Sequence, residues 1–326
     1  MEAFAIVVVH CGFNRALELC LRQARKTNPA ARVFWLGDDA DGAERAKEVG
    51  VEFRSLDEPA LSDGIAEFKS IYLGRSKNRP RLTEFCCKRW IYVRNLMRAE
   101  NLRSCLALDS DVLLFCDAAE EAKRFQDFAG TFTRWDAAPR YTPHCNFIGS
   151  LDGLEEFCDF LFEVYRNTAL FQELERKLAK VRWGKTPKRV WISDMSLWGA
   201  WSLRTNRKIA VFDDYYPQGV WVDGKINDAS YFKTRNFLPG VVKPWRKIVD
   251  FRDGRPWGET KDGKRGPFLA LHYQGGFKFL MEDHFEGRHS DWAIFKRLLV
   301  DKTKSVPQRI AHFTRRYLIA PLTKRG

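Results

Sequence analysis

Short apolar runs alternate with helical patterns over the first hundred or so residues of the chain. Residues 5–9 form an unbroken, mostly β-branched apolar run, which is typical of a strand buried on both faces. Further strands are predicted at 33–36, 51–53 and 105–108, and helices at 17–24, 43–49 and 85–100. This order predicts an α/β fold of the Rossmann type, with a mostly parallel sheet flanked by helices.

The second half of the chain has a less regular pattern. Helices are predicted at 154–167, 171–181 and 192–202, followed by loops and short strands over 217–266. A final buried strand at 268–271 runs directly into His272. Because no linker separates the halves, we expect one catalytic domain over residues 1–285 and a basic helical appendage over 286–326.

Polar or glycine residues follow three of the predicted strands. His10 and Gly12 follow the first strand, Asp38 the second, and Asp109-Ser110-Asp111 the fourth. Open α/β sheets bind ligands beyond the carboxyl ends of their strands, so these residues are candidates for binding a nucleotide. The chain has no G-x-G-x-x-G sequence, which argues against a standard dinucleotide site.

Asp109 and Asp111 lie between a buried strand and another apolar segment. Two carboxylates in apolar surroundings are costly unless a positive charge compensates them, and a divalent cation does this well. Hard carboxylate oxygens suit Mg²⁺ or Mn²⁺, which usually also bind substrate phosphates. The alternative is an Asp-turn, or a helix cap before Ala118.

A second group of polar residues follows the last buried strand. His272 would complete a metal site, and its nitrogen would favour Mn²⁺ over Mg²⁺. Gly275 and Gly276 would let backbone amides approach a diphosphate, and Lys278 would supply a positive charge. The alternative is a tight Gly-Gly turn with a surface lysine.

Together these motifs resemble those of the GT-A-fold glycosyltransferases, most closely family 8, which includes glycogenin and bacterial galactosyl- and glucosyltransferases. That family carries a D-x-D after a buried strand and a late H-x-x-G-x-x-K. Here they stand as Asp109-x-Asp111 and His272-x-x-Gly275-x-x-Lys278. The resemblance implies that Asp109, Asp111 and His272 bind the metal, and that Gly275 and Lys278 hold the donor diphosphate.

Three further segments are similar to the same family. Asn146 corresponds to an asparagine that contacts the donor sugar, and Asp194 to an acidic residue facing the transferred sugar. Lys88-Arg89 and Arg94 look like the basic residues near the nucleotide. The family's acidic residue at the end of the first strand is replaced by His10-Cys11-Gly12, so Asp38 or Asp39 becomes the candidate for the base or ribose.

The resemblance implies transfer of a hexose from a nucleotide-diphosphate sugar, expected to be a UDP-sugar, to a glycan or glycolipid acceptor. The metal, Mn²⁺ or Mg²⁺, would neutralise the leaving diphosphate. Retention of anomeric configuration is expected, with Asp194 stabilising an oxocarbenium-like centre or orienting the acceptor. If the reaction inverts, Asp194 is the first candidate for the general base. Asp194 also suits a plain helix N-cap.

The formal charge of +13 bears on partners and not on fold. No nucleic-acid-binding motif accompanies it, so we expect an anionic ligand or membrane surface instead of nucleic acid. The eight cysteines have no disulfide or metal spacing, and the N-terminal apolar run is too short for a signal peptide or membrane span. These features favour a cytosolic location.

The end of the chain has the pattern of a basic amphipathic helix. Val306, Ile310, Phe313 and Tyr317 share one helical face, with arginines elsewhere. Residues 290–326 would then rest on an anionic membrane, placing the protein on its inner face, or pack against the main domain. Two other classes stay open for the whole chain: a metal-dependent nucleotidyltransferase, and a non-enzymatic nucleic-acid binder.

Overall fold

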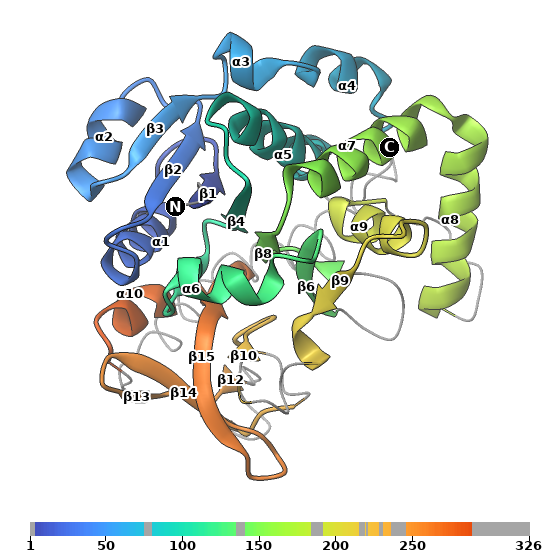
Figure 1. The fold of residues 1–326 in the computed structure, drawn as a ribbon. Coiled ribbons are helices and arrows are strands. Elements are labelled where there is room, and N and C mark those ends of the chain that lie inside the picture. The colour runs from blue at the N-terminus through green and yellow to red at the C-terminus, as the bar shows by residue number, and fades with distance from the viewer. Residues whose placement is uncertain are drawn as a thin grey trace, which may run out of the picture.

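The computed structural model describes residues 4–74, 80–134, 141–183, 192–214, 219, 221–227, 231–235 and 246–288. Its central sheet has the strand order β3-β2-β1-β4-β8 (Figure 1). The first four strands are parallel and β8 is antiparallel to β4, so the predicted α/β fold with a mostly parallel sheet is confirmed. These strands are β1 (Phe4–Val9), β2 (Arg32–Gly37), β3 (Glu52–Ser55), β4 (Ser104–Leu108) and β8 (Cys145–Ile148).

Helices cover both faces of this sheet, as the side chains of β1 show. Ala5 and Val7 pack in one core with α5, α7 and α9, whereas Ile6 and Val8 pack in a second core with α1. All four side chains are fully buried, which confirms a strand enclosed on both faces. The α-helices are α1 (Arg15–Thr27), α2 (Gly42–Val49), α3 (Pro59–Ser62), α4 (Ile65–Ile71), α5 (Pro80–Ala99), α6 (Ala118–Ala122), α7 (Leu151–Arg166), α8 (Thr168–Trp183), α9 (Asp194–Ser202) and α10 (Leu280–Phe285).

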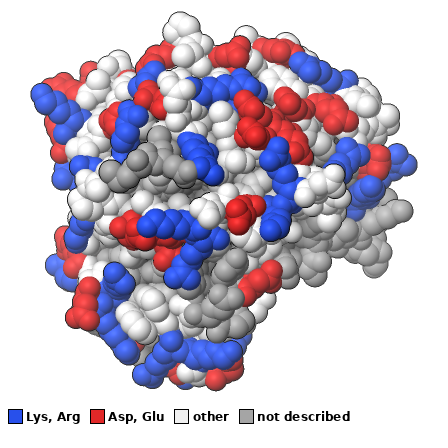
Figure 2. Space-filling view, in the orientation of Figure 1, with Lys and Arg blue, Asp and Glu red and all other residues white. Residues whose placement is uncertain are grey.

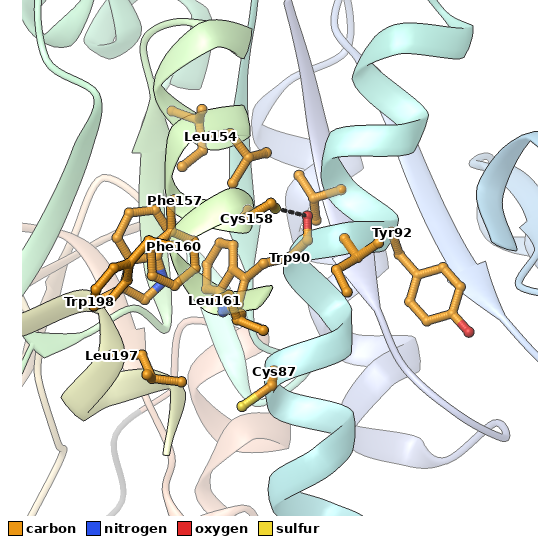
Figure 3. Packing of buried hydrophobic residues seen from close by; sticks show 14 of the residues in the cluster. Cys87, Trp90, Tyr92, Leu154, Phe157, Cys158, Phe160, Leu161, Leu197 and Trp198 are labelled. Carbon is orange, nitrogen blue, oxygen red and sulfur yellow. Dashed lines mark hydrogen bonds between the residues drawn. The ribbon is translucent and has the colours of Figure 1, made fainter. Parts of the chain in front are cut away.

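Aromatic packing fixes three of these helices against one another (Figure 3). Phe157 of α7 stacks on Trp198 of α9, with ring centroids 3.5 Å apart and planes 6° apart. Trp90 of α5 meets the same Trp198 ring edge-on at 5.1 Å. Cys158 donates a 3.6 Å hydrogen bond from its Sγ to the Trp90 carbonyl. The middle of α9 is therefore held close to the middle of α5.

Short strands make up most of the region after α9. They include a second sheet of order β10-β15-β14-β13, in which β15 also pairs with β5. The pairing of β15 with β5 is antiparallel and sets His272 opposite Val112, directly after the Asp109–Asp111 turn. The remaining strands are β5 (Val112–Leu114), β6 (Gly130–Arg134), β7 (Tyr141–Thr142), β9 (Ile209–Val211), β10 (Trp221–Val222), β11 (Thr234–Arg235), β12 (Arg246–Lys247), β13 (Asp250–Arg252), β14 (Arg255–Glu259) and β15 (Arg265–His272).

Element boundaries differ from the sequence-based predictions by a few residues. The helix predicted at 85–100 begins five residues earlier, at Pro80, a residue that suits the first turn of a helix. The final strand extends from Arg265 to His272 instead of 268–271, because its first half pairs with β14 as part of a hairpin. The expected amphipathic helix at 306–317 lies outside the described residues, and so does all but 286–288 of the predicted appendage.

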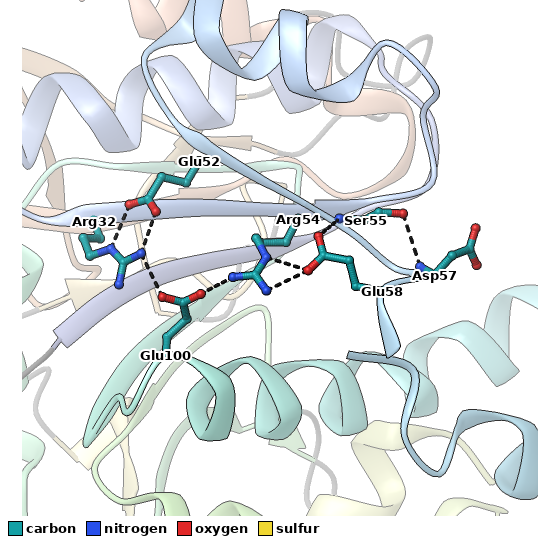
Figure 4. Close-up of polar contacts among 7 residues, drawn as sticks. All are labelled: Arg32, Glu52, Arg54, Ser55, Asp57, Glu58 and Glu100. Atoms are coloured by element: carbon teal, nitrogen blue, oxygen red, sulfur yellow. Dashed lines mark hydrogen bonds and ion pairs between the residues drawn. The ribbon is translucent and has the colours of Figure 1, made fainter. Parts of the chain in front are cut away.

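A network of charged side chains joins β2, β3 and the turn after β3 to the end of α5 (Figure 4). Arg32 donates to Glu52 in a two-pronged contact, at 2.8 and 2.6 Å, and contacts Glu100 at 2.9 Å. Glu100 also pairs with Arg54, which reaches Glu58. We call these five residues the edge network. Its members are partly exposed, and it runs along β3, the edge strand of the central sheet, from Arg32 near the amino end to Arg54 beside Leu36 near the carboxyl end.

Among the described residues, no helix combines the length and the apolar character needed to cross a bilayer.

Candidate metal and donor site

The structure brings together the three residues predicted to bind a metal. Asp109 and Asp111 occupy the turn between β4 and β5, and His272 ends β15. One ligand atom from each residue lies within 4.8 Å of the others, and the His272 Nε2 to Asp111 Oδ1 distance is 3.5 Å. The turn is fixed by its backbone, since Tyr273 N–H donates to the Asp111 carbonyl at 2.9 Å.

The ring of His272 is oriented for ligation. Its Nδ1 lies 2.8 Å from the Gly224 carbonyl, so Nδ1 carries the proton in the neutral ring and the lone pair of Nε2 faces Asp111. Burial acts to lower the pKa of His272, but its contact with Asp111 outweighs burial and raises that pKa. The pKa of Asp111 is lowered by His272 and Lys278 in spite of burial. Two carboxylates and an imidazole nitrogen form a donor set that suits Mn²⁺ or Mg²⁺.

Two cationic side chains also contact the carboxylates. Lys278 Nζ lies 3.1 Å from Asp111 Oδ2 and is partly exposed. Arg89 on α5 forms ion pairs with both Asp109 and Asp194, the second at 2.7 Å. Arg89 therefore connects the predicted metal ligands to the predicted catalytic carboxylate, and its side chain is only 14% exposed.

Asp194 is the first residue of α9, and the residue in the N-cap position is Ser193. The reading of Asp194 as the N-cap is therefore wrong. The Ser196 hydroxyl oxygen accepts a hydrogen bond from Ser193 N–H at 2.8 Å, and the Asp194 carboxylate accepts from Met195 N–H at 2.9 Å. Burial and the negative charge of Asp109 raise the pKa of Asp194 against the opposing effect of Arg89. Asp194 thus combines a buried carboxylate with a direct contact to Arg89.

The residues predicted at the first two strand ends contact one another. The Asp38 carboxylate accepts a 2.7 Å hydrogen bond from Gly12 N–H, and Ser110 Oγ lies 3.0 Å from His10 Nδ1. Burial, followed by the charge of Lys278, lowers the pKa of His10. Gly12 has a left-handed backbone, with φ of 68°. These four residues form a polar surface next to the metal ligands. Asp39 instead contacts Arg45, at 3.7 Å.

Asn146 lies in β8, opposite Ala107 of β4, and is fully buried. Its Oδ1 accepts a 2.8 Å hydrogen bond from Thr131 N–H in β6. Its Nδ2 has no hydrogen-bond partner among the described residues. An amide donor that is buried without a partner is rare in folded proteins, and it leaves Asn146 able to donate to a ligand.

Gly275 and Gly276 begin a short 3₁₀ turn, Gly275–Phe277, between β15 and Lys278. Gly275 has φ of 64°, which a side chain would strain, and an added Cβ at either glycine would meet no atom within 4 Å. The backbone here is open to a close approach by a ligand. The tight Gly-Gly turn stated as the alternative is therefore present, and its backbone is exposed.

Two of the basic residues singled out on the α5 helix do not reach the metal ligands. Lys88 pairs with Glu84 at 2.9 Å, one helical turn away. Arg94 lines a separate surface pocket with Gly64 and Phe162, between α4, α5 and α7. A helix turns about 100° per residue, so Arg89 and Arg94 leave α5 in different directions. Of the three basic residues, only Arg89 reaches the site.

Three residues that the sequence did not single out lie behind His272. Asp223 and Gly224 follow β10, and Lys247 ends β12. Asp223 and Lys247 form an ion pair in which both side chains are almost fully buried. The sequence signal for them is slight: an acidic residue and a glycine directly after Trp221-Val222, with the matching lysine far along the chain.

No protein-family model matches the chain, and no curated protein matches it. Solved structures with a similar fold include mouse xyloside xylosyltransferase 1 in its apo form, at 11% identity and a TM-score of 0.44, over 64% of this chain and 84% of that one. An active-site mutant of LgtC is similar at 14% identity and a TM-score of 0.43, over 83% of this chain and 87% of that one. A cytidylyltransferase from Leptospira borgpetersenii is similar at 13% identity and a TM-score of 0.32, over 52% of this chain and 73% of that one. These neighbours include glycosyltransferases and a cytidylyltransferase, and all three have TM-scores below 0.5.

Proposed function

We propose that this protein transfers a hexose from a nucleotide-diphosphate sugar to a glycan or glycolipid acceptor, in a metal-dependent reaction that retains the anomeric configuration. The expected nucleotide is a uridine diphosphate. The observation that carries this proposal is the convergence of Asp109, Asp111 and His272 at the carboxyl edge of the sheet, with Lys278 beside them. Nucleotide ligands of open α/β sheets bind at this edge.

The chemistry follows from the charges in the site. Mn²⁺ or Mg²⁺ held by Asp109, Asp111 and His272 would neutralise negative charge on the leaving diphosphate. Lys278 and the backbone amides at Gly275 and Gly276 add preorganised positive potential to the same region. The polar surface formed by His10, Gly12, Asp38 and Ser110 would bind the nucleoside.

The transferred sugar would lie between Asn146 and Asp194. The Asn146 Nδ2 donor has no partner among the described residues, and it would bind a sugar hydroxyl. Asp194 would face the positive charge that develops at the anomeric carbon, with Arg89 fixing its carboxylate. If the product is inverted, Asp194 instead serves as the general base. The anomeric configuration of the product, read by NMR, separates these two roles.

The segment that follows the first strand argues against a nucleotidyltransferase. Those enzymes usually carry a phosphate-binding loop directly after the first strand, and this loop is rich in glycine, arginine and lysine. The corresponding basic residue here, Arg15, is engaged by Glu18 at 2.9 Å and Glu282 at 3.0 Å. On the face shown in Figure 2, lysines and arginines are interspersed with aspartates and glutamates, which is unlike the continuous basic stripe of a nucleic-acid binder.

The direct test incubates the protein with Mn²⁺ and a panel of nucleotide sugars and measures release of nucleoside diphosphate. Release that depends on the metal, and that is absent from the Asp109→Asn variant, is the expected result. Release of pyrophosphate from a nucleoside triphosphate would establish a nucleotidyltransferase instead. Release of neither product under any condition would reject both enzymatic functions.

Residues 290–326 bear on the acceptor. If they bind an anionic membrane, as their sequence pattern predicts, the acceptor would be lipid-linked or part of the cell envelope, and the protein would lie on the inner membrane face. Flotation with anionic liposomes, comparing the full chain with a truncation after Asp301, tests this. Equal flotation of both forms would contradict membrane binding through this segment.

A further inference from the structure

A short segment after β10 wraps around the end of β15. Asp223 N–H donates to the Ala270 carbonyl at 3.0 Å, and Ile226 N–H donates to the His272 carbonyl at 2.9 Å. Between these two contacts, the Asp223 carboxylate accepts from His272 N–H at 3.2 Å, and the Gly224 carbonyl lies 2.8 Å from His272 Nδ1. Both the backbone and the ring of His272 are therefore held by this one segment.

Lys247 fastens the segment from behind. Its Nζ contacts the Asp223 carboxylate and donates to the Lys225 carbonyl at 2.8 Å, while its backbone N–H donates to the Ile226 carbonyl at 2.9 Å. The Lys247 side chain is 4% exposed and that of Asp223 is fully buried. Replacing a buried ion pair by apolar residues is often neutral or stabilising, so stability alone does not account for this pair.

The ring of His272 is also enclosed by its neighbours. The ring of His144 stacks on it, with centroids 4.3 Å apart and planes 8° apart, and the His144 carbonyl accepts from Asp109 N–H at 2.8 Å. On the side of the wrapping segment, a Cβ added to Gly224 would lie 2.8 Å from the Thr133 Cγ2 methyl of β6. The Gly224 carbonyl can therefore approach Nδ1 only because residue 224 has no side chain.

We propose that Asp223, Gly224 and Lys247 form a latch, and that the latch positions His272 so that its Nε2 faces Asp111. These three are positioning residues, since they act through His272 and contact no ligand themselves. The chemical purpose of the latch rests on the proposed metal site. The orientation of the ring is a property of the chain alone and can be measured without a metal.

The first measurement is the ring tautomer of His272 by ¹⁵N NMR, recorded above the raised pKa of His272 so that the ring is neutral. A His272→Gln variant assigns its signals among the six histidines. The wild-type ring is expected to carry its proton on Nδ1. The paired variant Asp223→Asn with Lys247→Met removes both charges together, which avoids leaving one buried charge alone. It should show a mixture of tautomers.

The second measurement is the affinity for Mn²⁺ by electron paramagnetic resonance, with uridine diphosphate present. Loss of outer-shell partners typically weakens metal binding by about 10–100-fold, and we expect the paired variant to fall in this range. Gly224→Ala leaves every charge in place and should also weaken Mn²⁺ binding, because the added methyl group would push the residue 224 carbonyl away from His272 Nδ1. It also serves if the paired variant does not fold.

The matched control is Arg54→Met with Glu58→Gln, which removes an ion pair from the edge network. It should leave both the His272 tautomer and the Mn²⁺ affinity unchanged. The latch is overturned if the folded variants at 223, 224 and 247 keep the wild-type tautomer and bind Mn²⁺ as tightly as the wild type. If the wild type binds no Mn²⁺, the proposed function fails, while the tautomer measurement still decides on the latch.

Discussion

Two ion clusters of nearly the same composition lie along the edge strand β3 and beyond the end of β4, in different surroundings. The edge network has three carboxylates, at 52, 58 and 100, and two arginines. Beyond the end of β4, Asp109, Asp111 and Asp194 meet Arg89 and Lys278, together with His272; we call these six residues the site cluster.

Exposure differs most between one ion pair in each cluster, although Glu100 in the edge network is only 16% exposed and Lys278 in the site cluster is 43% exposed. In the edge network, Arg32 and Glu52 are 43% and 46% exposed, whereas in the site cluster Arg89 and Asp194 are 14% and 6% exposed. Exposed ion pairs contribute about 0–1 kcal/mol each, because water already solvates both charges. Buried carboxylates are costly without compensation and so create a demand for cations. The burial of the Arg89–Asp194 pair, and not the number of charges, makes the site cluster the candidate for function.

The largest expected difference concerns activity. Asp111→Asn replaces an anionic ligand by a neutral one and should lower the transfer rate by about 10³-fold, which is roughly 4 kcal/mol of lost transition-state stabilisation. The comparable change in the edge network, Glu100→Gln, should leave the rate unchanged. Nucleoside diphosphate release at saturating donor measures both. Equal losses would mean that the two clusters do not differ in function.

The next difference concerns stability. Arg89→Met leaves Asp109 and Asp194 without their shared cation and should reduce the free energy of unfolding by about 3–5 kcal/mol. Arg54→Met, in the edge network, should cost about 1 kcal/mol or less. Urea denaturation followed by circular dichroism gives both values. A cost for Arg89→Met as small as that for Arg54→Met would contradict the role given to burial.

A third difference appears on changing pH. The pKa of His272 is raised in the folded protein, so its contribution to metal-free stability is fully present below about pH 6.5, its usual pKa, and is lost as pH rises through the folded pKa. Mn²⁺ binding should show the opposite trend and strengthen with rising pH, because the ring must lose its proton to bind a metal. Thermal unfolding between pH 6 and 8.5, with and without Mn²⁺, measures both trends.

The edge network supplies the control for this pH experiment. The hydrogen bonds that Glu58 accepts from Arg54 and Ser55 lower its pKa in spite of partial burial. Its contribution is therefore present above about pH 4.3, its usual pKa, and is lost only as pH falls through the lower folded value. Glu58→Gln should shift the melting temperature by the same amount at every pH between 6 and 8.5. A shift that varies over this range would point to a further titrating group.

The smallest expected effect is the response to salt. A double-mutant cycle on Arg32 and Glu52 should give a coupling of about 0.2–1 kcal/mol that declines between 0.05 and 0.5 M NaCl, because exposed charges are screened. The same cycle on Arg89 and Asp194 should give a larger coupling that changes less with salt. Similar salt dependence in both cycles would remove the distinction drawn from exposure.

The sequence predicted the sheet well because its evidence is local. The apolar run at 5–9 and the helical spacing from 85 onward each reflect one element in contact with the core. The three metal-ligand candidates could be predicted because polar residues directly follow buried strands. Only the resemblance to a family implied that they meet, and the structure brings them together through the pairing of His272 with Val112.

The parts that could not be predicted depend on contacts between distant residues. Nothing near Lys247 in the sequence indicates that it pairs with Asp223, and a lysine is usually exposed. Helix geometry already separates the directions of Arg89 and Arg94, but which of the two faces the site depends on the rotation of α5 about its axis, set by packing with α7 and α9. Charged residues in particular give no local signal of whether they will be buried.

The antiparallel pairing of β15 with β5 has a consequence for the order of events during synthesis. Asp109 and Asp111 leave the ribosome long before His272, so the early strands can form while one ligand of the metal is still untranslated. A nascent chain therefore lacks the full ligand set until β15 has been made and has inserted beside β5. Under the proposed function, metal affinity would therefore report on completed folding, because a chain interrupted before β15 lacks His272.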